Sequence, residues 1–146
     1  MFLVHSTFEF LSEAADNISA CDREEFDKMQ EGRDLKATLL KSLGPTSRTI
    51  LSKRGDVLAT GGSNDCLWFV TTTHVQDLTK KERLQLLLLL RRHLENVRKV
   101  LPAEKMSNYV YEHNFTHRRL LDALGARYGL YQEYSPAGHP FRQFWL

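Results

Sequence analysis

The chain has 146 residues, of which 42% are hydrophobic and 26% are charged, so its size and composition fit one globular domain with a single core. Its longest apolar run, the five leucines from Leu86 to Leu90, is too short for a membrane-spanning segment. The formal net charge is +2, but residues 74–146 hold 12 basic and 7 acidic side chains, which favours an anionic ligand or partner for this half.

The N-terminus and the two cysteines carry little functional signal. The first ten residues lack the basic start and continuous apolar run of a secretory signal, so we expect an intracellular protein. Cys21 and Cys66 fit no metal-ligand spacing. In a reducing compartment we expect them to be small buried side chains rather than a disulfide.

The first part of the chain is predicted to be mainly helical. Apolar residues recur at helical spacing over residues 7–17, which predicts a first helix. Residues 18–21 are predicted to form a short strand. Asp22, with Glu25 three residues later, is typical of an N-cap and predicts a second helix that ends near Gly32.

A change of pattern follows the third predicted helix. Residues 34–42 carry leucines on one helical face and end before Gly44-Pro45. The next segments, "SRTILS", "VLATG" and "CLWFVTTTHV", are rich in β-branched and aromatic residues and are separated by Gly55-Asp56 and by "GGSND". These turns predict a three-stranded antiparallel meander.

The second half is predicted to begin with its strongest helix. Thr79 and Glu82 form a capping box, and the helix that follows is apolar on most faces of its middle, so we expect it to be buried between other layers. "MSNYVYEH" then predicts a strand, "FTHRRLLDAL" a helix ending at Gly125, and "ARYGLYQEY" and "PFRQFWL" two further strands. The order predicts an α/β (α+β) fold, a mixed sheet covered by helices. We expect one domain over residues 1–146, with residues 1–17 as an N-terminal helical extension.

This order of elements resembles the GNAT (general N-acetyltransferase) superfamily over roughly residues 18–146. A local feature supports the likeness: Asn114 follows a predicted strand, a helix comes next, and Gly125-Ala126 begins eleven residues after the asparagine. More narrowly, "ACDREEFDKM", "LWFVTTTHV", "NYVYEHNFTHRRLLDALGARY" and "PFRQFW" resemble the GNAT-like internal virion proteins of short-tailed bacteriophages.

The resemblance implies an acetyl-coenzyme A site at the start of the long helix. Relatives bind the pyrophosphate there through a Q/R-x-x-G-x-G/A loop, whose N–H groups face the anion. Here Gln76 is kept, but Thr79 and Lys81 stand where small residues are expected, and the capping box competes for the same N–H groups. Lys80, Lys81 and Arg83 still offer positive charge. An ordinary capped helix with a solvated basic first turn explains the same residues.

Two further parts of the implied site have structural alternatives. Thr73 and Val75, at the end of the third meander strand, would pair with the pantetheine arm, but surface residues on a half-buried strand fit as well. Asn114 is expected near the cofactor in the superfamily, and it is also a good N-cap for the following helix.

The proton-transfer group is the weakest part of the implied site. Relatives often place a tyrosine seven residues beyond the asparagine, and that position here is Leu121, which can donate no proton. His74 is the candidate base, with Tyr109 and Tyr111 as other nearby groups, although a lone histidine is more often structural.

Three other groups of residues suggest alternative functions. His113 and His117 have a spacing used in metal sites, but no third ligand is apparent, so we expect no metal. A basic set with nearby tyrosines could bind nucleic acid, but strand tyrosines usually pack on the sheet, so nucleic acid ranks below protein as a partner. The closing aromatic residues form either a last strand or an anchor for another protein.

The sequence therefore predicts a bacteriophage protein with an acetyltransferase-like fold. We expect an internal virion, morphogenesis or infection-stage interaction protein with a degenerate acyl-CoA site, in which binding of acetyl-CoA is reduced or lost. Its expected partner is a phage or host protein, and its expected place is the host cytoplasm, with incorporation in the virion as an extension. The alternative is an active acetyl-CoA-dependent N-acetyltransferase that modifies a host or phage protein. Enzymatic activity and oligomeric state stay open.

Overall fold

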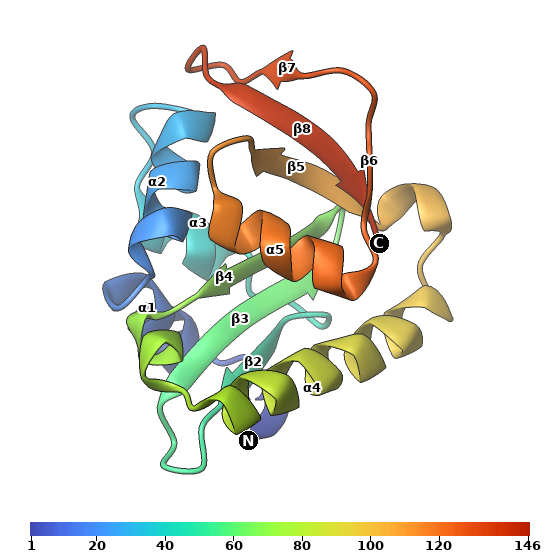
Figure 1. Cartoon of the computed structure of the whole chain (residues 1–146). Coiled ribbons are helices and arrows are strands. Elements are labelled where there is room, and N and C mark those ends of the chain that lie inside the picture. The colour runs from blue at the N-terminus through green and yellow to red at the C-terminus, as the bar shows by residue number, and fades with distance from the viewer.

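A computed structural model describes residues 1–146 and has five α-helices and two four-stranded antiparallel sheets (Figure 1). The predicted α/β class is confirmed, although the strands form two separate antiparallel sheets and not the one mixed sheet that the sequence predicts. The first sheet has the order β1-β2-β3-β4, with bounds Phe2–His5, Arg48–Leu51, Val57–Ser63 and Leu67–Thr71. In the second sheet β8 (Pro140–Trp145) pairs with β5 (Ser107–Tyr111), β6 (Arg127–Tyr128) and β7 (Glu133–Tyr134).

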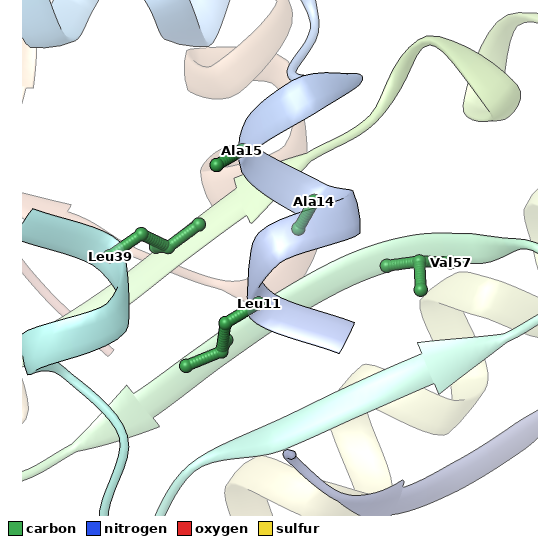
Figure 2. Close-up of a cluster of buried hydrophobic side chains, with 5 residues drawn as sticks. All are labelled: Leu11, Ala14, Ala15, Leu39 and Val57. Atoms are coloured by element: carbon green, nitrogen blue, oxygen red, sulfur yellow. The ribbon is translucent and has the colours of Figure 1, made fainter. Parts of the chain in front are cut away.

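Helices cover both faces of the first sheet. They are α1 (Phe8–Asp16), α2 (Ala20–Met29), α3 (Leu35–Lys41), α4 (Lys80–Arg98) and α5 (Phe115–Leu124), with short 3-10 turns η1 (Thr73–Asp77) and η2 (Ala103–Lys105). On one face, α1 and α3 pack over β3 through Leu11, Ala14, Ala15, Leu39 and Val57 (Figure 2). On the other face, α4 and α5 pack on residues such as Ile50 and Leu58. No helix combines the length and apolar character needed to cross a bilayer.

The N-terminal segment belongs to this core. Residues 1–17 were expected as a helical extension, but Phe2–His5 forms a strand that pairs antiparallel with β2, from Phe2 opposite Leu51 to His5 opposite Arg48. The predicted first helix is confirmed as α1, capped by the Thr7 side chain. Because Leu11 is fully buried, α1 contributes to the core rather than lying outside it.

The prediction of a strand at residues 18–21 was wrong. Only Ile18 forms a bridge, to Thr72, and α2 begins at Ala20. Asp22 is not the N-cap, because Ser19 occupies that position and Asp22 lies in the first turn. The carboxylate of Asp22 instead reaches a strand far along the chain.

Most other elements match the prediction, with two corrections. The third helix, the meander, and the capping box at the start of α4 are confirmed. The third meander strand ends at Thr71, since Thr73–Asp77 turns into η1. The helix α4 is buried on one face only, because Leu84 and Leu88 on its other face are 55% and 52% exposed.

The predicted strand over residues 126–134 is split into β6 and β7. Tyr128 lies opposite Phe144 and Glu133 opposite Phe141. Tyr128 and Glu133 are five positions apart in the sequence, whereas their partners Phe144 and Phe141 are three positions apart. Two extra residues therefore bulge out of this edge of the sheet. The predicted last strand is confirmed as β8, which is the central strand of its sheet.

The strands β4 and β5 run in the same direction and diverge along their length (Figure 1). No ladder joins them, and the two sheets are separate. Near the start of both strands, Asn108 Nδ2 donates to Leu67 O at 2.5 Å. At the wider end, α2 contacts both β5 and α5. This opening is the feature that positions the candidate site.

The burial of α1 generates a stability prediction. Replacing Leu11 by alanine leaves a cavity beneath α1, and we expect a loss of about 3 kcal/mol in the free energy of unfolding. The matched control, Phe8→Ala, changes an exposed residue of the same helix and should cost less than about 1 kcal/mol. Urea unfolding measures both values. Equal, small losses would mean that α1 is a detachable extension.

Candidate functional site

A cavity of about 330 Å³ lies at the opening between β4 and β5. Most of its lining is hydrophobic and comes from β3, β4, β8 and the helices on both faces of the first sheet. Its polar lining includes Asp22 and Glu25 of α2, Asn108 and Tyr109 of β5, and His117 of α5. Such a mostly apolar pocket with a few convergent polar groups has the general character of a ligand site.

The edge of β4 that borders this opening is occupied by the chain itself. Thr71 N donates to Asp22 Oδ2 at 2.7 Å, and Thr71 O accepts from Ser19 N at 2.9 Å. Thr73 N donates to Asn17 O at 2.8 Å. Thr72 N faces the other way and donates to Leu58 O at 2.9 Å. The outward N–H groups of Thr71 and Thr73 and the outward carbonyl of Thr71 are therefore satisfied by the segment between α1 and α2 and by Asp22.

Across the opening, the carboxylate of Glu25 collects three groups from the second half of the chain. Its Oε2 accepts from Tyr111 N and from Asn114 Nδ2, both at 3.0 Å. Its Oε1 lies 3.0 Å from His117 Nδ1. Asn114 also accepts from His117 N through its Oδ1 at 3.1 Å, so it caps α5 as well as contacting α2.

The Glu25–His117 pair is shielded from water, with side chains 17% and 10% exposed. Burial by itself lowers the pKa of His117, but the hydrogen bond and charge of Glu25, together with the charge of Asp22, more than offset it and raise this pKa above its ordinary value. The imidazolium is thus favoured beside the carboxylate. Since Glu25 already binds three partners, the pair acts chemically as a tie between α2 and α5.

The start of α4 is closed by its own side chains. Thr79 N donates to Glu82 Oε2 at 2.9 Å, and Glu82 N donates to Thr79 Oγ1 at 3.3 Å. Arg83 turns back and donates to Leu78 O and Gln76 O, both at 3.0 Å. Lys80 and Lys81 remain exposed in the first turn. Lys80 and Lys81 are therefore available to an anion here. The N–H groups of Thr79 and Glu82, at the helix end where a pyrophosphate would bind, are already used within the capping box.

The structure leaves most of the other sequence-predicted residues outside the cavity. Thr73, His74 and Val75 lie in η1, outside its lining, and Val75 packs against the cluster around Ile50. Leu121 does line the cavity, where it is buried with Val110 and Phe144. The structure therefore does not unite His74 with the polar groups of the opening.

Metal chemistry has no ligand set. His113 is exposed whereas His117 is buried against Glu25, so the two do not face one site. No group of three or more His, Cys, Asp or Glu side chains is placed to hold a metal ion. His113 lies in the turn before α5, so the spacing of four residues is not a helical one.

Asp22 and Glu25 are the residues that sequence reasoning missed at this site. Their spacing predicts a local capping pattern, whereas both carboxylates bind groups at least 49 positions away. A local pattern contains no signal for such partners.

Residues 47–135 match the protein family described as "Bacteriophage T7, probable scaffold protein Gp13". This match covers more than half of the chain, from the first meander strand to β7. The chain belongs to this family. The expectation of a bacteriophage protein is thereby confirmed. Asp22 and Glu25 lie before the matched segment. No curated protein and no solved structure gives a significant match.

The raised pKa of His117 gives the stability of this family member a defined pH dependence. Because the folded-state pKa exceeds the unfolded one, the stabilising contribution is complete below the unfolded value, about 6.5, and is lost as pH rises through the folded value. The stability advantage of the wild type over His117→Gln should therefore be larger at pH 5.5 than at pH 9. Urea unfolding at both pH values measures it.

His5→Gln, at an exposed position of β1, is the control for a histidine change. It should alter the free energy of unfolding by less than about 0.5 kcal/mol. An advantage over His117→Gln that grows with pH would contradict the assigned ion pair with Glu25.

Proposed function

We propose that the chain is a protein-interaction component of bacteriophage assembly, with a GNAT-like fold whose acyl-CoA site is no longer used. The family description, a probable scaffold protein, supports a role in building the particle. Such a protein acts in the host cytoplasm during assembly. Its partners are other phage proteins, and its incorporation in the virion is part of the proposal.

The GNAT-like part of the proposal rests on the divergence of β4 from β5. A long helix follows β4, and Asn114 caps the helix that follows β5. The resemblance to the GNAT superfamily implies this same arrangement, in which two neighbouring strands diverge and leave a gap between them. Fold kinship alone licenses no chemistry, so activity has to be argued from the site.

The observation that carries the loss of cofactor binding is the occupied edge of β4. A pantetheine arm would pair with outward backbone groups near Thr71 and Thr73, and these already bind Ser19, Asp22 and Asn17. A cofactor would have to replace these hydrogen bonds, and the buried carboxylate of Asp22 would lose the bond from Thr71 N while keeping the one from Thr71 Oγ1. Loss of a hydrogen bond to a buried charge is unfavourable, which supports a site that stays closed.

The alternative, an active N-acetyltransferase, is favoured by two observations. The cavity at the strand opening has room for a small ligand, and Lys80 and Lys81 are exposed at the start of α4. On this alternative, acetyl-CoA binds with its pyrophosphate on these lysines. The two functions differ in one measurable property, the affinity for acetyl-CoA.

A surface feature supports the interaction role. The bulge between β6 and β7 displays Leu130 and Tyr131, which are 86% and 79% exposed, and Tyr134 is also exposed nearby. Large apolar and aromatic side chains grouped in this way are typical of protein contacts, where tyrosine is often an important residue.

The decisive experiment is calorimetric titration of the chain with acetyl-CoA. We expect no binding at millimolar ligand and no upward shift of the melting temperature. Binding at micromolar affinity that is lost in the Lys80→Glu/Lys81→Glu variant would instead establish the alternative. Asp22→Ala serves as a further comparison, since removing this carboxylate frees the N–H of Thr71.

A second experiment addresses assembly. We expect Leu130→Ser/Tyr131→Ser to leave the free energy of unfolding within about 0.5 kcal/mol, because both side chains are exposed. The same variant should associate with phage particles at least tenfold less than the wild type, measured by co-sedimentation. Val100→Ser, at another exposed apolar position, is the matched control. Unchanged association would contradict a role for the bulge.

A further inference from the structure

The exposed side of α4 is unusual for a helix of a protein core. Leu84 and Leu88 lie one turn apart, and each exposes more than half of its surface. The core uses the opposite side, through Leu86, Leu90 and Leu94. At 3.6 residues per turn, the two exposed leucines form a narrow apolar strip pointing away from the sheet.

Basic residues border this strip on both sides. Lys81 and Arg92 lie within roughly 40° of Leu88 around the helix axis on one side. Lys80 and Arg91 lie within roughly 40° of Leu84 on the other side. We call this surface the basic-leucine face: Lys80, Lys81, Leu84, Leu88, Arg91 and Arg92. It spans about 18 Å along the axis, a little more than three helical turns.

The positive charge of this face is not neutralised within the chain. None of the salt bridges in the protein involves a residue of α4. Arg91 donates to a backbone oxygen, that of Ala123, at 2.6 Å, which leaves its charge uncompensated. Residues 80–99 contain seven basic and two acidic side chains. The two acidic residues are Glu82 and Glu95. Because Glu82 belongs to the capping box, Glu95 is the one free carboxylate beside the strip.

We propose that the basic-leucine face binds an acidic amphipathic helix of another protein. This inference rests on the proposed interaction function and assigns it a surface and a partner chemistry. Leucines of the partner would pack on Leu84 and Leu88, while its carboxylates would pair with Lys81, Arg91 and Arg92, in the manner of an apolar helix face held by flanking charges.

Charge distinguishes this occupant from the others. A second copy of the chain would bring the same positive face and would be repelled. A nucleic acid would match the charge but would cover two leucines with phosphates and sugars, and the face carries no aromatic side chain for base stacking. An acidic helix satisfies both the apolar strip and its basic borders.

The test uses a designed, fluorescein-labelled 18-residue helix with leucines at i and i+4 flanked by glutamates. We expect anisotropy to report micromolar binding to the full chain, weakened at least tenfold in Leu84→Ser/Leu88→Ser and in Lys81→Glu/Arg92→Glu. A peptide with lysines in place of glutamates should bind the charge-reversed variant better than the wild type. Lys105→Glu, an exposed change outside α4, should bind like the wild type.

Three results would overturn the inference: no binding of the acidic helix, binding that both double variants retain, or stronger binding at equal salt to duplex DNA or to vesicles containing phosphatidylglycerol. Urea unfolding confirms that each variant is folded, and the exposed positions make this expected. The face variants should also lower association with phage particles. If they do not while Leu130→Ser/Tyr131→Ser does, the surface assignment fails and the proposed function stands.

Discussion

The structure depends on the way α2 joins two sheets that share no β-ladder. Asp22 binds the end of β4, and Glu25, one turn later, binds Tyr111, Asn114 and His117 of the second half. Both acids lie on the same side of one short helix, so a single rigid element spans the opening. Since buried carboxylates are stable only when paired, loss of either set of contacts would weaken the relation between the sheets.

The same contacts set the chemistry of the opening. In an enzyme that inserts a cofactor between diverging strands, the exposed strand edge has to remain free for the ligand. Here that edge serves the fold, because Ser19 and Asp22 use the backbone groups of Thr71. The start of α4 is occupied in the same way, because Glu82 and Thr79 each accept a hydrogen bond from the other's backbone N–H. Stability of the fold and binding of a cofactor thus compete for the same atoms.

Sequence reasoning succeeded where the signal was local. The capping box of α4, the glycine after α5 and the helical periodicity place α1, α3, α4 and α5, and turn sequences place the meander. It failed where an element is defined by a distant partner. The strand β1 exists because Phe2 pairs with Leu51, and the split of β6 from β7 follows from their shared partner β8. At the site, the cap formed by Asn114 was readable locally, whereas the contacts of Glu25 were not.

The helix α4 contributes both to the core and to an exposed surface of the protein. Its leucine run supplies more apolar side chains than the sheet can cover, because one helix presents a single face to one sheet. Leu86 and Leu90 complete the core, and Leu84 and Leu88 add nothing to it. Exposed leucines lower solubility, and the flanking lysines and arginines counter this only until an oppositely charged partner arrives. The proposed acidic helix of another protein would cover this excess.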